Sequence, residues 1–238
     1  MLMRNRCRVL PLLAVISLVS AQVRALAVDV VVGDPQVYGQ AQNAFPFGTL
    51  PQYYGYASTR YQQVYSSGAF PGSVRIQELV FYPSGNLQAL TLPATFEVFF
   101  SVTDRGVNEI SFRPFDDNLG GDPRFFASVQ GGHSLSGGEL VIRGAPFLYD
   151  PTQGNLLLDI RVNGAPLGYT GPYFAALGPE NFARSTAVPF SRWHDFGIGF
   201  DNHGLVTGFR EYVPEPGTLV LVGLGLLGLG LLRRHRLN

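Results

Sequence analysis

The sequence has no lysine, a single cysteine and no long stretch with the apolar periodicity of an amphipathic helix. All seventeen basic residues are arginine. The cysteine, Cys7, lies in an N-terminal segment that we expect to be removed on export, so the exported protein would have no thiol. Disulfides, thiolate catalysis and cysteine-containing metal sites are therefore excluded.

The first 27 residues have the three parts of a secretory signal peptide. Arginines precede an apolar run from Val9 to Val19, and small residues follow it. Cleavage can follow Ala21 or Ala27, and the second position is a literal Ala-x-Ala match. An uncleaved membrane anchor is the alternative.

The C-terminal residues 213–238 have a second export-related pattern. A proline-rich strip is followed by an uncharged run from Thr218 to Leu232 and by a basic cluster; the residues of the strip and the cluster are Pro214, Glu215, Pro216, Gly217, Arg233, Arg234 and Arg236. The prolines favour an extended, exposed segment. A helix over the run would be about 22 Å long, which is short for a membrane span of about 20 residues. The arginines would extend its reach and stay cytoplasmic.

Together these features resemble a PEP-CTERM sorting signal, the C-terminal tail that the membrane transpeptidase exosortase cuts in bacteria. The resemblance implies that the seven residues named above are the sorting motif and that an exosortase-type transpeptidase is a partner. It also implies a precursor held in the inner membrane by a C-terminal transmembrane helix, and a processed protein at the cell surface or in the extracellular matrix. A permanent single-span anchor with a proline-rich stalk is the alternative.

The chain between the two ends, residues 28–213, is acidic. It has ten arginines against sixteen acidic residues, a formal charge of −6. Nucleic-acid binding is not expected, because affinity for phosphate backbones comes largely from basic residues. The charge is compatible with divalent cations or a neutral polysaccharide.

The composition and periodicity predict an all-β domain, an antiparallel β-sandwich of jelly-roll or immunoglobulin-like type, with a closed barrel as the alternative. The N-terminal signal helix and the C-terminal transmembrane helix flank it. We expect four parts: the signal peptide (1–27), a loop-rich segment (28–58), the β-sandwich ectodomain (59–212) and the sorting signal (213–238). A long excursion is expected over 164–189.

Two strands are predicted with their faces. Residues 94–103 place Phe96, Val98, Phe100 and Val102 on one face and Thr95, Glu97, Phe99 and Ser101 on the other. Residues 155–162 place Leu156, Leu158, Ile160 and Val162 inward and Asp159 and Arg161 outward. Weaker strand predictions cover 60–65, 74–82 with a bulge near Glu78, 124–129, 139–142, 182–188, 196–200 and 205–209.

The body is also similar to recurring ectodomains of obscure function that are attached to PEP-CTERM tails. The similar pieces are residues 60–65, 70–72, 115–120, 146–151 and 154–159. This likeness implies an extracytoplasmic all-β domain and brings no catalytic residues.

One segment gathers oxygen ligands that suit calcium. Asp116, Asp117, Asn118 and Asp122 surround a Gly-Gly pair on a predicted loop. The segment is not an EF-hand, because Ala127 stands where that motif needs a bidentate glutamate. The alternative is a solvated turn whose side chains bond nearby backbone amides.

Aromatic residues provide a second candidate, a platform on which sugar rings stack. Its members are Tyr53, Tyr54, Tyr56 and Trp193, with Tyr61 and Tyr65 on a predicted strand. Core packing is the alternative, since aromatic residues on strands are most often buried.

No catalytic motif is complete. Residues 132–136 approach a hydrolase nucleophile elbow, but Ser136 stands where its second glycine belongs. We therefore expect a non-enzymatic structural or surface protein without a resident cofactor. The alternatives are an exopolysaccharide-binding module, with or without calcium, and a polysaccharide-acting hydrolase.

Overall fold

The computed structural model describes residues 29–35, 42–48, 58–84, 90–107, 109–110, 114–121, 123–133, 135, 138–166, 171–176, 190–194, 200–201 and 204–211. These ranges contain β1 (Val30–Val32), β2 (Gln42–Asn43), β3 (Ser58–Tyr65), β4 (Val74–Phe81), β5 (Pro83–Ser84), β6 (Thr95–Thr103), β7 (Arg124–Gln130), β8 (Leu140–Tyr149), β9 (Asn155–Asn163), β10 (Tyr173–Ala175), β11 (Phe190–His194), β12 (Phe200–Asp201) and β13 (Thr207–Arg210). Three short 3-10 helices join them: η1 (Ser67–Ala69), η2 (Phe115–Asn118) and η3 (Pro151–Gln153).

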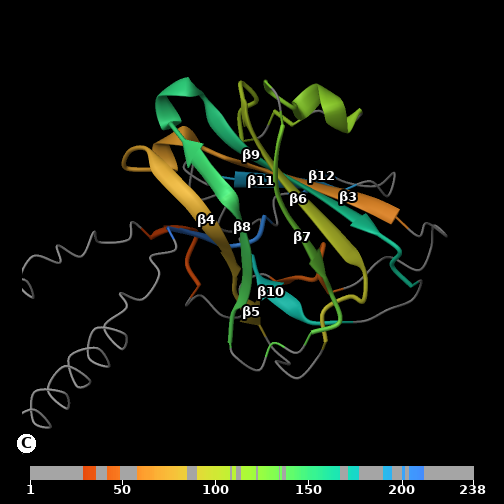
Figure 1. Cartoon of the computed structure of the whole chain (residues 1–238). Helices are drawn as coiled ribbons and strands as arrows, with labels where there is room; N and C mark the ends of the chain where they lie inside the picture. The colour runs from red at the N-terminus through yellow and green to blue at the C-terminus, as the bar shows by residue number, and fades with distance from the viewer. Residues whose placement is uncertain are drawn as a thin grey trace, which may run out of the picture.

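The strands form antiparallel sheets, which confirms the all-β, antiparallel part of the predicted fold class. A four-stranded sheet has the order β1-β13-β4-β8, and a six-stranded sheet has the order β12-β11-β3-β9-β6-β7. A small third sheet has the order β2-β10-β5. Figure 1 shows β4 and β8 of the four-stranded sheet in front of the six-stranded sheet, with the small sheet at one end.

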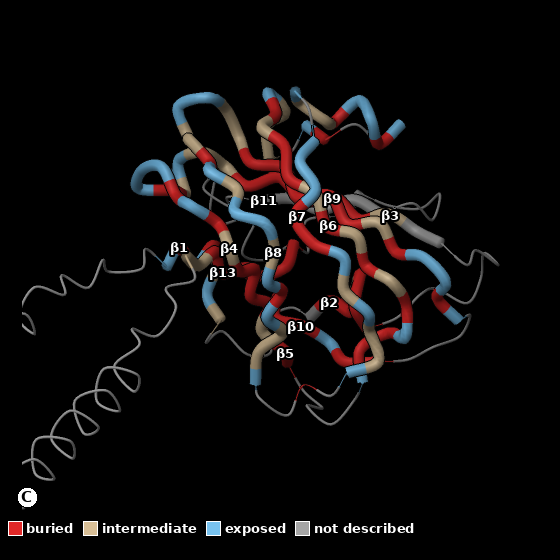
Figure 2. Tube along the Cα trace, viewed as in Figure 1, coloured by how far each residue is buried: buried red, intermediate tan, exposed pale blue. Residues whose placement is uncertain are grey.

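One hydrophobic core joins the two larger sheets. It takes Ile76 and Leu79 from the four-stranded sheet and Val98 and Ile160 from the six-stranded sheet, all fully buried. Buried positions dominate β4, β6 and β9, whereas β7 and β8 also have exposed positions along their length (Figure 2). Burial of this apolar surface is the main favourable contribution to folding.

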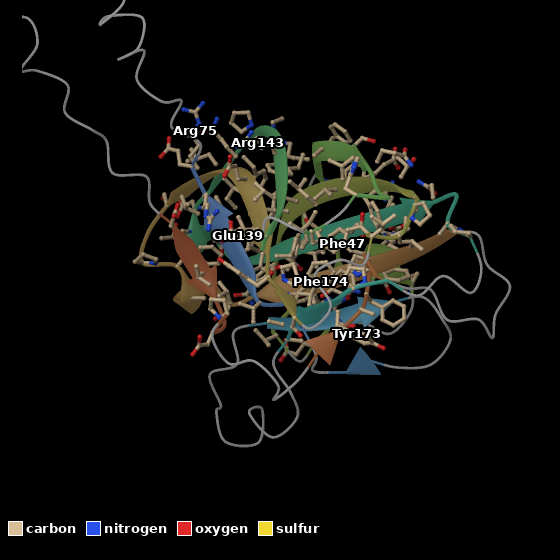
Figure 3. All side chains as sticks on the ribbon, turned by 90° about the horizontal axis from the view of Figure 1, so that it is seen from below. Phe47, Arg75, Glu139, Arg143, Tyr173 and Phe174 are labelled. Atoms are coloured by element: carbon tan, nitrogen blue, oxygen red, sulfur yellow. The ribbon has the colours of Figure 1, made fainter. Side chains whose placement is uncertain are left out.

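Phe47 fills the end of the core that the small sheet covers. Its ring lies 4.9 Å from that of Phe81, 5.1 Å from Phe96 and 5.6 Å from Phe174. Figure 3 shows Phe47 and Phe174 inside the molecule, while Arg143 lies at its outer rim. The segment predicted as loop-rich thus supplies a core residue, and its strands β1 and β2 pair with β13 and β10.

The alternation predicted for residues 94–103 and 155–162 is confirmed on the inner face. Phe96, Val98 and Phe100 are buried, and Val102 packs against the same core. The outward prediction for Asp159 is wrong in one respect, because this residue is only 1% exposed. Residues 114–119 pack over that part of the outer face. The alternation of apolar and polar residues within one strand cannot predict that a distant segment packs there.

The predicted strands differ from the observed ones mainly in length. The bulge predicted near Glu78 is present, as a register shift between Ile76 and Glu78. β8 continues to Tyr149, well beyond the predicted 139–142. Its second half includes Pro146, which has no backbone N–H to donate. β8 is an edge strand of its sheet, and proline is tolerated there because no hydrogen bond to a neighbouring strand is lost. β11 was not predicted, and the segment 182–188 lies outside the described residues.

The two larger sheets approach each other closely where β7 and β8 run side by side. β7 is the last strand of one sheet and β8 the last strand of the other. A Cβ on Gly144 would lie 2.5 Å from the carbonyl oxygen of Phe126, so only glycine allows this approach. The Phe126 ring packs against Phe100 with centroids 5.1 Å apart. One pocket lined by both strands lies on each side of this contact.

Candidate functional site

The two ends of the described chain leave the domain at the same place. β1 pairs antiparallel with β13, and the register aligns Val30 with Phe209. Arg210 lies 3.6 Å from the carboxylate of Asp29 and makes two bonds of 2.9 Å to Glu139. These charges, above all the hydrogen bond to Glu139, raise the pKa of Arg210. The segments that precede Asp29 and follow Arg210 therefore start from adjacent strands.

The predicted sorting residues follow directly after this point. Pro214 comes four residues after Arg210, which corresponds to at most about 14 Å of extended chain. Pro214, Glu215, Pro216, Gly217, Arg233, Arg234 and Arg236 all lie outside the described residues, as does the predicted signal peptide. Among the residues that the structure does describe, no helix has the length and apolar character needed to cross a membrane.

Three of the predicted calcium ligands, Asp116, Asp117 and Asn118, lie on η2, which rests on the outer face of the six-stranded sheet. Phe115 packs there with Val64, Ile110 and Leu157 in a second, smaller apolar cluster. The chain can lie so close to β6 because residue 120 is glycine. A Cβ at that position would be 1.4 Å from the carbonyl oxygen of Val102.

The side chains of the predicted ligands point to different partners. Asp116 is exposed and its carboxylate accepts a 2.7 Å bond from Arg60. Asn118 is fully buried, and its amide donates to Gln62 at 2.9 Å. Asp117 is exposed, and its backbone carbonyl accepts two bonds from Arg105. The segment is thus a short turn fastened to the sheet by its polar groups.

Arg60 is the centre of this attachment. Its guanidinium makes two bonds to the buried carboxylate of Asp159, at 2.6 and 2.7 Å, and lies 5.0 Å above the ring of Phe115. Burial works against its charge, but the bonds and charges of Asp159 and Asp116 outweigh this and raise the pKa of Arg60. The bond from Arg60 in turn lowers the pKa of Asp116.

This geometry leaves the calcium prediction open. Within the described ranges, no three His, Cys, Asp or Glu side chains gather closely enough to hold a metal ion. Asp122, the fourth predicted ligand, lies outside them. The exposed carboxylates of Asp116 and Asp117 are the described groups that a cation could reach.

The predicted tyrosines fall into two groups. Tyr61 and Tyr65 are buried core residues, so the core-packing interpretation is correct for them. Tyr53, Tyr54 and Tyr56 lie outside the described residues. For Trp193 the backbone alone is described, and it pairs with Gln62 in the ladder between β11 and β3.

An aromatic pair that the sequence prediction did not include lies on the outer face of the six-stranded sheet. The rings of Phe99 and Phe125 are 5.5 Å apart in an edge arrangement, and Phe125 is 53% exposed. Arg161 stacks over Phe99 at 4.4 Å. The outward position of Phe99 in its strand was a usable signal, since an apolar ring on that face needs a partner or a ligand.

The polar side chains beside this pair form a continuous surface. Register places Glu97 next to Arg161, and Asn163 donates to Glu97 at 3.3 Å. Thr95 donates to Gln130 at 3.0 Å on the neighbouring strand. Rings and planar polar groups on one exposed sheet face are suited to bind a flat, hydroxyl-rich ligand.

The comparisons with known proteins concern the C-terminal region. Residues 213–234 match the family described as PEP-CTERM protein-sorting motif, which confirms the resemblance of the C-terminal tail. No curated protein and no solved structure matches the chain. The motif implies an exported surface protein that is recognised by an exosortase, a membrane transpeptidase.

Proposed function

We propose that this protein, which carries a PEP-CTERM sorting motif, is a non-enzymatic structural component of the cell envelope or extracellular matrix. The match of residues 213–234 carries the proposal. In this view residues 1–27 are removed, and a membrane helix over residues 218–232 holds the precursor until the exosortase cuts near Pro214–Gly217. The working part is then an acidic β-sandwich of jelly-roll or immunoglobulin-like type.

The pairing of β1 with β13 supports this order of events. A body whose first and last strands are neighbours can fold while both flanking segments are still held at one membrane surface. The short chain between Arg210 and Pro214 keeps the folded body near the enzyme that processes it.

The test compares two glutamates of the same segment. Glu215→Gln changes the sorting motif, whereas Glu211→Gln changes the residue that follows β13 and serves as the matched control. We expect the first variant to accumulate as membrane-bound precursor and the second to reach the surface or medium like the native protein. Normal processing of Glu215→Gln, or a native protein that stays uncleaved in the membrane, would contradict the proposal.

A second candidate function is binding of exopolysaccharide to the outer face of the six-stranded sheet. The observation that favours it is the exposed pair Phe99 and Phe125, with Arg161 and Glu97 beside it. Sugar rings stack on aromatic faces, while carboxylate and guanidinium groups bond to their hydroxyls. Tyr53, Tyr54, Tyr56 and Trp193 remain additional candidates for the same role.

Affinity electrophoresis in gels containing the exopolysaccharide of the producing cells tests this function. Phe125→Ala is expected to remove most of the retardation. Tyr173→Ala removes another exposed ring, 47% exposed on β10 of the small sheet, and is the matched control with unchanged mobility. Absence of retardation in the native protein would leave the structural role alone.

A calcium-assisted form of binding is tested by calorimetric titration with calcium. We expect Asp116→Ala and Asp122→Ala to weaken the heat signal if these residues bind the ion. A melting temperature that does not change in excess calcium would refute the metal site.

A further inference from the structure

An apolar pocket of about 300 Å³ opens at one end of the seam between the two larger sheets. It lies between the end of β7 and the start of β8, near the connection formed by residues 131–139. The Gly144–Phe126 contact lies further along the two strands. β7 and β8 belong to different sheets, so their side chains diverge at the pocket and leave space between them. None of the functions considered above uses this space.

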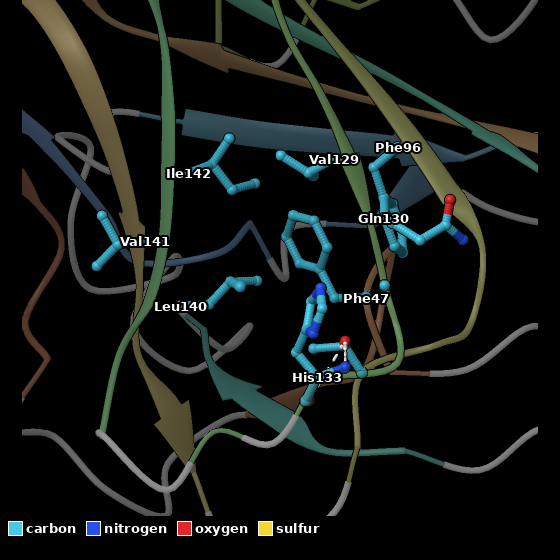
Figure 4. A pocket seen from close by; sticks show the side chains of 10 residues that line it. Phe47, Phe96, Val129, Gln130, His133, Leu140, Val141 and Ile142 are labelled. Carbon is cyan, nitrogen blue, oxygen red and sulfur yellow. Dashed lines mark hydrogen bonds between the residues drawn. The ribbon is translucent and has the colours of Figure 1, made fainter.

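The interior of the pocket is made of apolar side chains. Its innermost residues are Phe47, Phe96 and Ile142, each 1% exposed, and Val129 and Leu140 form the sides. Figure 4 shows Val129, Leu140 and Ile142 arranged around the ring of Phe47. No acidic side chain is among the described residues that line the pocket, so a negative charge at its mouth meets no direct repulsion.

The polar groups of the pocket lie at its rim. His133 and Gln130 both line the opening and are exposed. The Gln130 side chain bonds to Thr95 on the outer face of the sheet, away from the apolar interior. The hydrogen bonds that His133 makes to described residues involve its backbone alone, so its imidazole can donate to a ligand.

The rim is held in place by hydrogen bonds to the hydroxyl and the backbone of Thr91. The hydroxyl of Thr91 accepts from the amides of Gly132 and His133, both at 3.0 Å, and the amide of Thr91 donates to the carbonyl of His133 at 2.9 Å. Gly131 permits this packing, because a Cβ there would lie 1.9 Å from the carbonyl oxygen of Leu92. A rim fixed in this way loses little entropy when a ligand binds.

We propose that this pocket binds the apolar chain of a small amphiphile whose hydrogen-bond-accepting head, such as a carboxylate, lies at His133. The size limits the chain to about ten to twelve carbon atoms, because a cavity of about 150 Å³ holds one benzene molecule. A medium-chain fatty acid has this chemistry, and so has an acyl chain of a membrane lipid. The proposal is independent of sorting and of polysaccharide binding.

Fluorescence titration of the purified protein with N-phenyl-1-naphthylamine tests the pocket, with decanoate below its micellar concentration as competitor. We expect saturable binding of one probe per chain and its displacement by decanoate. Val129→Phe fills the pocket and should weaken probe binding at least tenfold without lowering the melting temperature. Val31→Phe places the same change at an exposed position of β1 and should leave binding unchanged.

Two further measurements locate the head and the source of the chain. His133→Ala should weaken displacement by decanoate while probe affinity stays the same. Vesicles of didecanoyl phosphatidylcholine should displace the probe as decanoate does if a lipid chain enters, and should have no effect if the pocket takes free acids alone. Either result is compatible with an acyl chain in the pocket.

NMR of methyl groups provides a readout that needs no variant. Decanoate should shift the methyl signals of Val129, Leu140 and Ile142 and leave that of Val31 in place. Non-saturable probe binding, native affinity in a folded Val129→Phe protein, or shifts elsewhere on the molecule would each overturn the proposal.

Discussion

The bond between Arg60 and Asp159 should be the most sensitive polar contact of the domain. Asp159 is 1% exposed and receives two short bonds from one guanidinium. Arg60→Ala would leave this carboxylate buried without its main partner, a change that typically costs about 3–5 kcal/mol. Gln62 at 3.3 Å and Arg161 at 3.6 Å remain nearby and offset part of the loss. We therefore expect the free energy of unfolding to fall by about 2–4 kcal/mol.

Asp116→Ala is the matched comparison, because it removes the other carboxylate that Arg60 contacts. The Asp116 side chain is 73% exposed, and an exposed ion pair contributes about 0–1 kcal/mol. Its lowered pKa means that the contribution is present above the pKa of the unfolded state and is lost as the pH falls through the folded pKa. The cost of Asp116→Ala should therefore become smaller as the pH falls below 4.

Urea unfolding of the purified protein, followed by tyrosine fluorescence, measures both values. The double variant Arg60→Met, Asp159→Leu removes both charges and should be more stable than Arg60→Ala alone. If Arg60→Ala and Asp116→Ala destabilise the protein equally, the buried carboxylate is not the reason that the turn stays on the sheet.

Two other predictions concern the stability of the domain, one at Gly120 and one at Tyr149. Gly120→Ala should lower the free energy of unfolding by about 1–3 kcal/mol or more, because the added Cβ would overlap the carbonyl oxygen of Val102. A Cβ on Gly121 would have no atom within 4 Å, so Gly121→Ala should be neutral. Equal melting temperatures of the two variants would show that this close approach is absent. Burial raises the pKa of Tyr149 to about 12, and its hydroxyl donates to Gly154 at 2.7 Å. Its stabilising contribution is full below about pH 10, the unfolded pKa of tyrosine, and should be lost as the pH rises towards 12. Denaturant titrations at pH 9 and 11 measure how much the free energy of unfolding falls between the two pH values. The fall should be smaller for Tyr149→Phe than for the native protein, and an equal fall in both proteins would contradict this.

The parts of the fold that follow from alternation could be predicted from the sequence. Strands β6 and β9 have inward residues of period two, and this pattern identified Phe96, Val98 and Leu158 as core residues. Their turns were also recognisable, because Gly154 and Gly164 adopt the positive φ that such signals require. The C-terminal sorting motif was equally accessible, since it depends on contiguous residues.

Features that depend on distant parts of the chain could not be predicted. Asp159 is buried because residues 114–119 fold over it, and Arg60 reaches it from a strand 99 residues away. Phe99 and Phe125 form a pair through the register of β6 and β7, which includes a shift after Val98. The pocket beside His133 results from the separation of two sheets, and no local motif encodes that separation.

The central claim is that residues 213–234 are a signal to be removed. Mass spectrometry of the mature protein, isolated from the cell surface or the culture medium, tests it most directly. We predict that its C-terminus lies between Pro214 and Gly217. A surface protein that retains residues 218–238 would contradict processing and would favour a permanent membrane anchor.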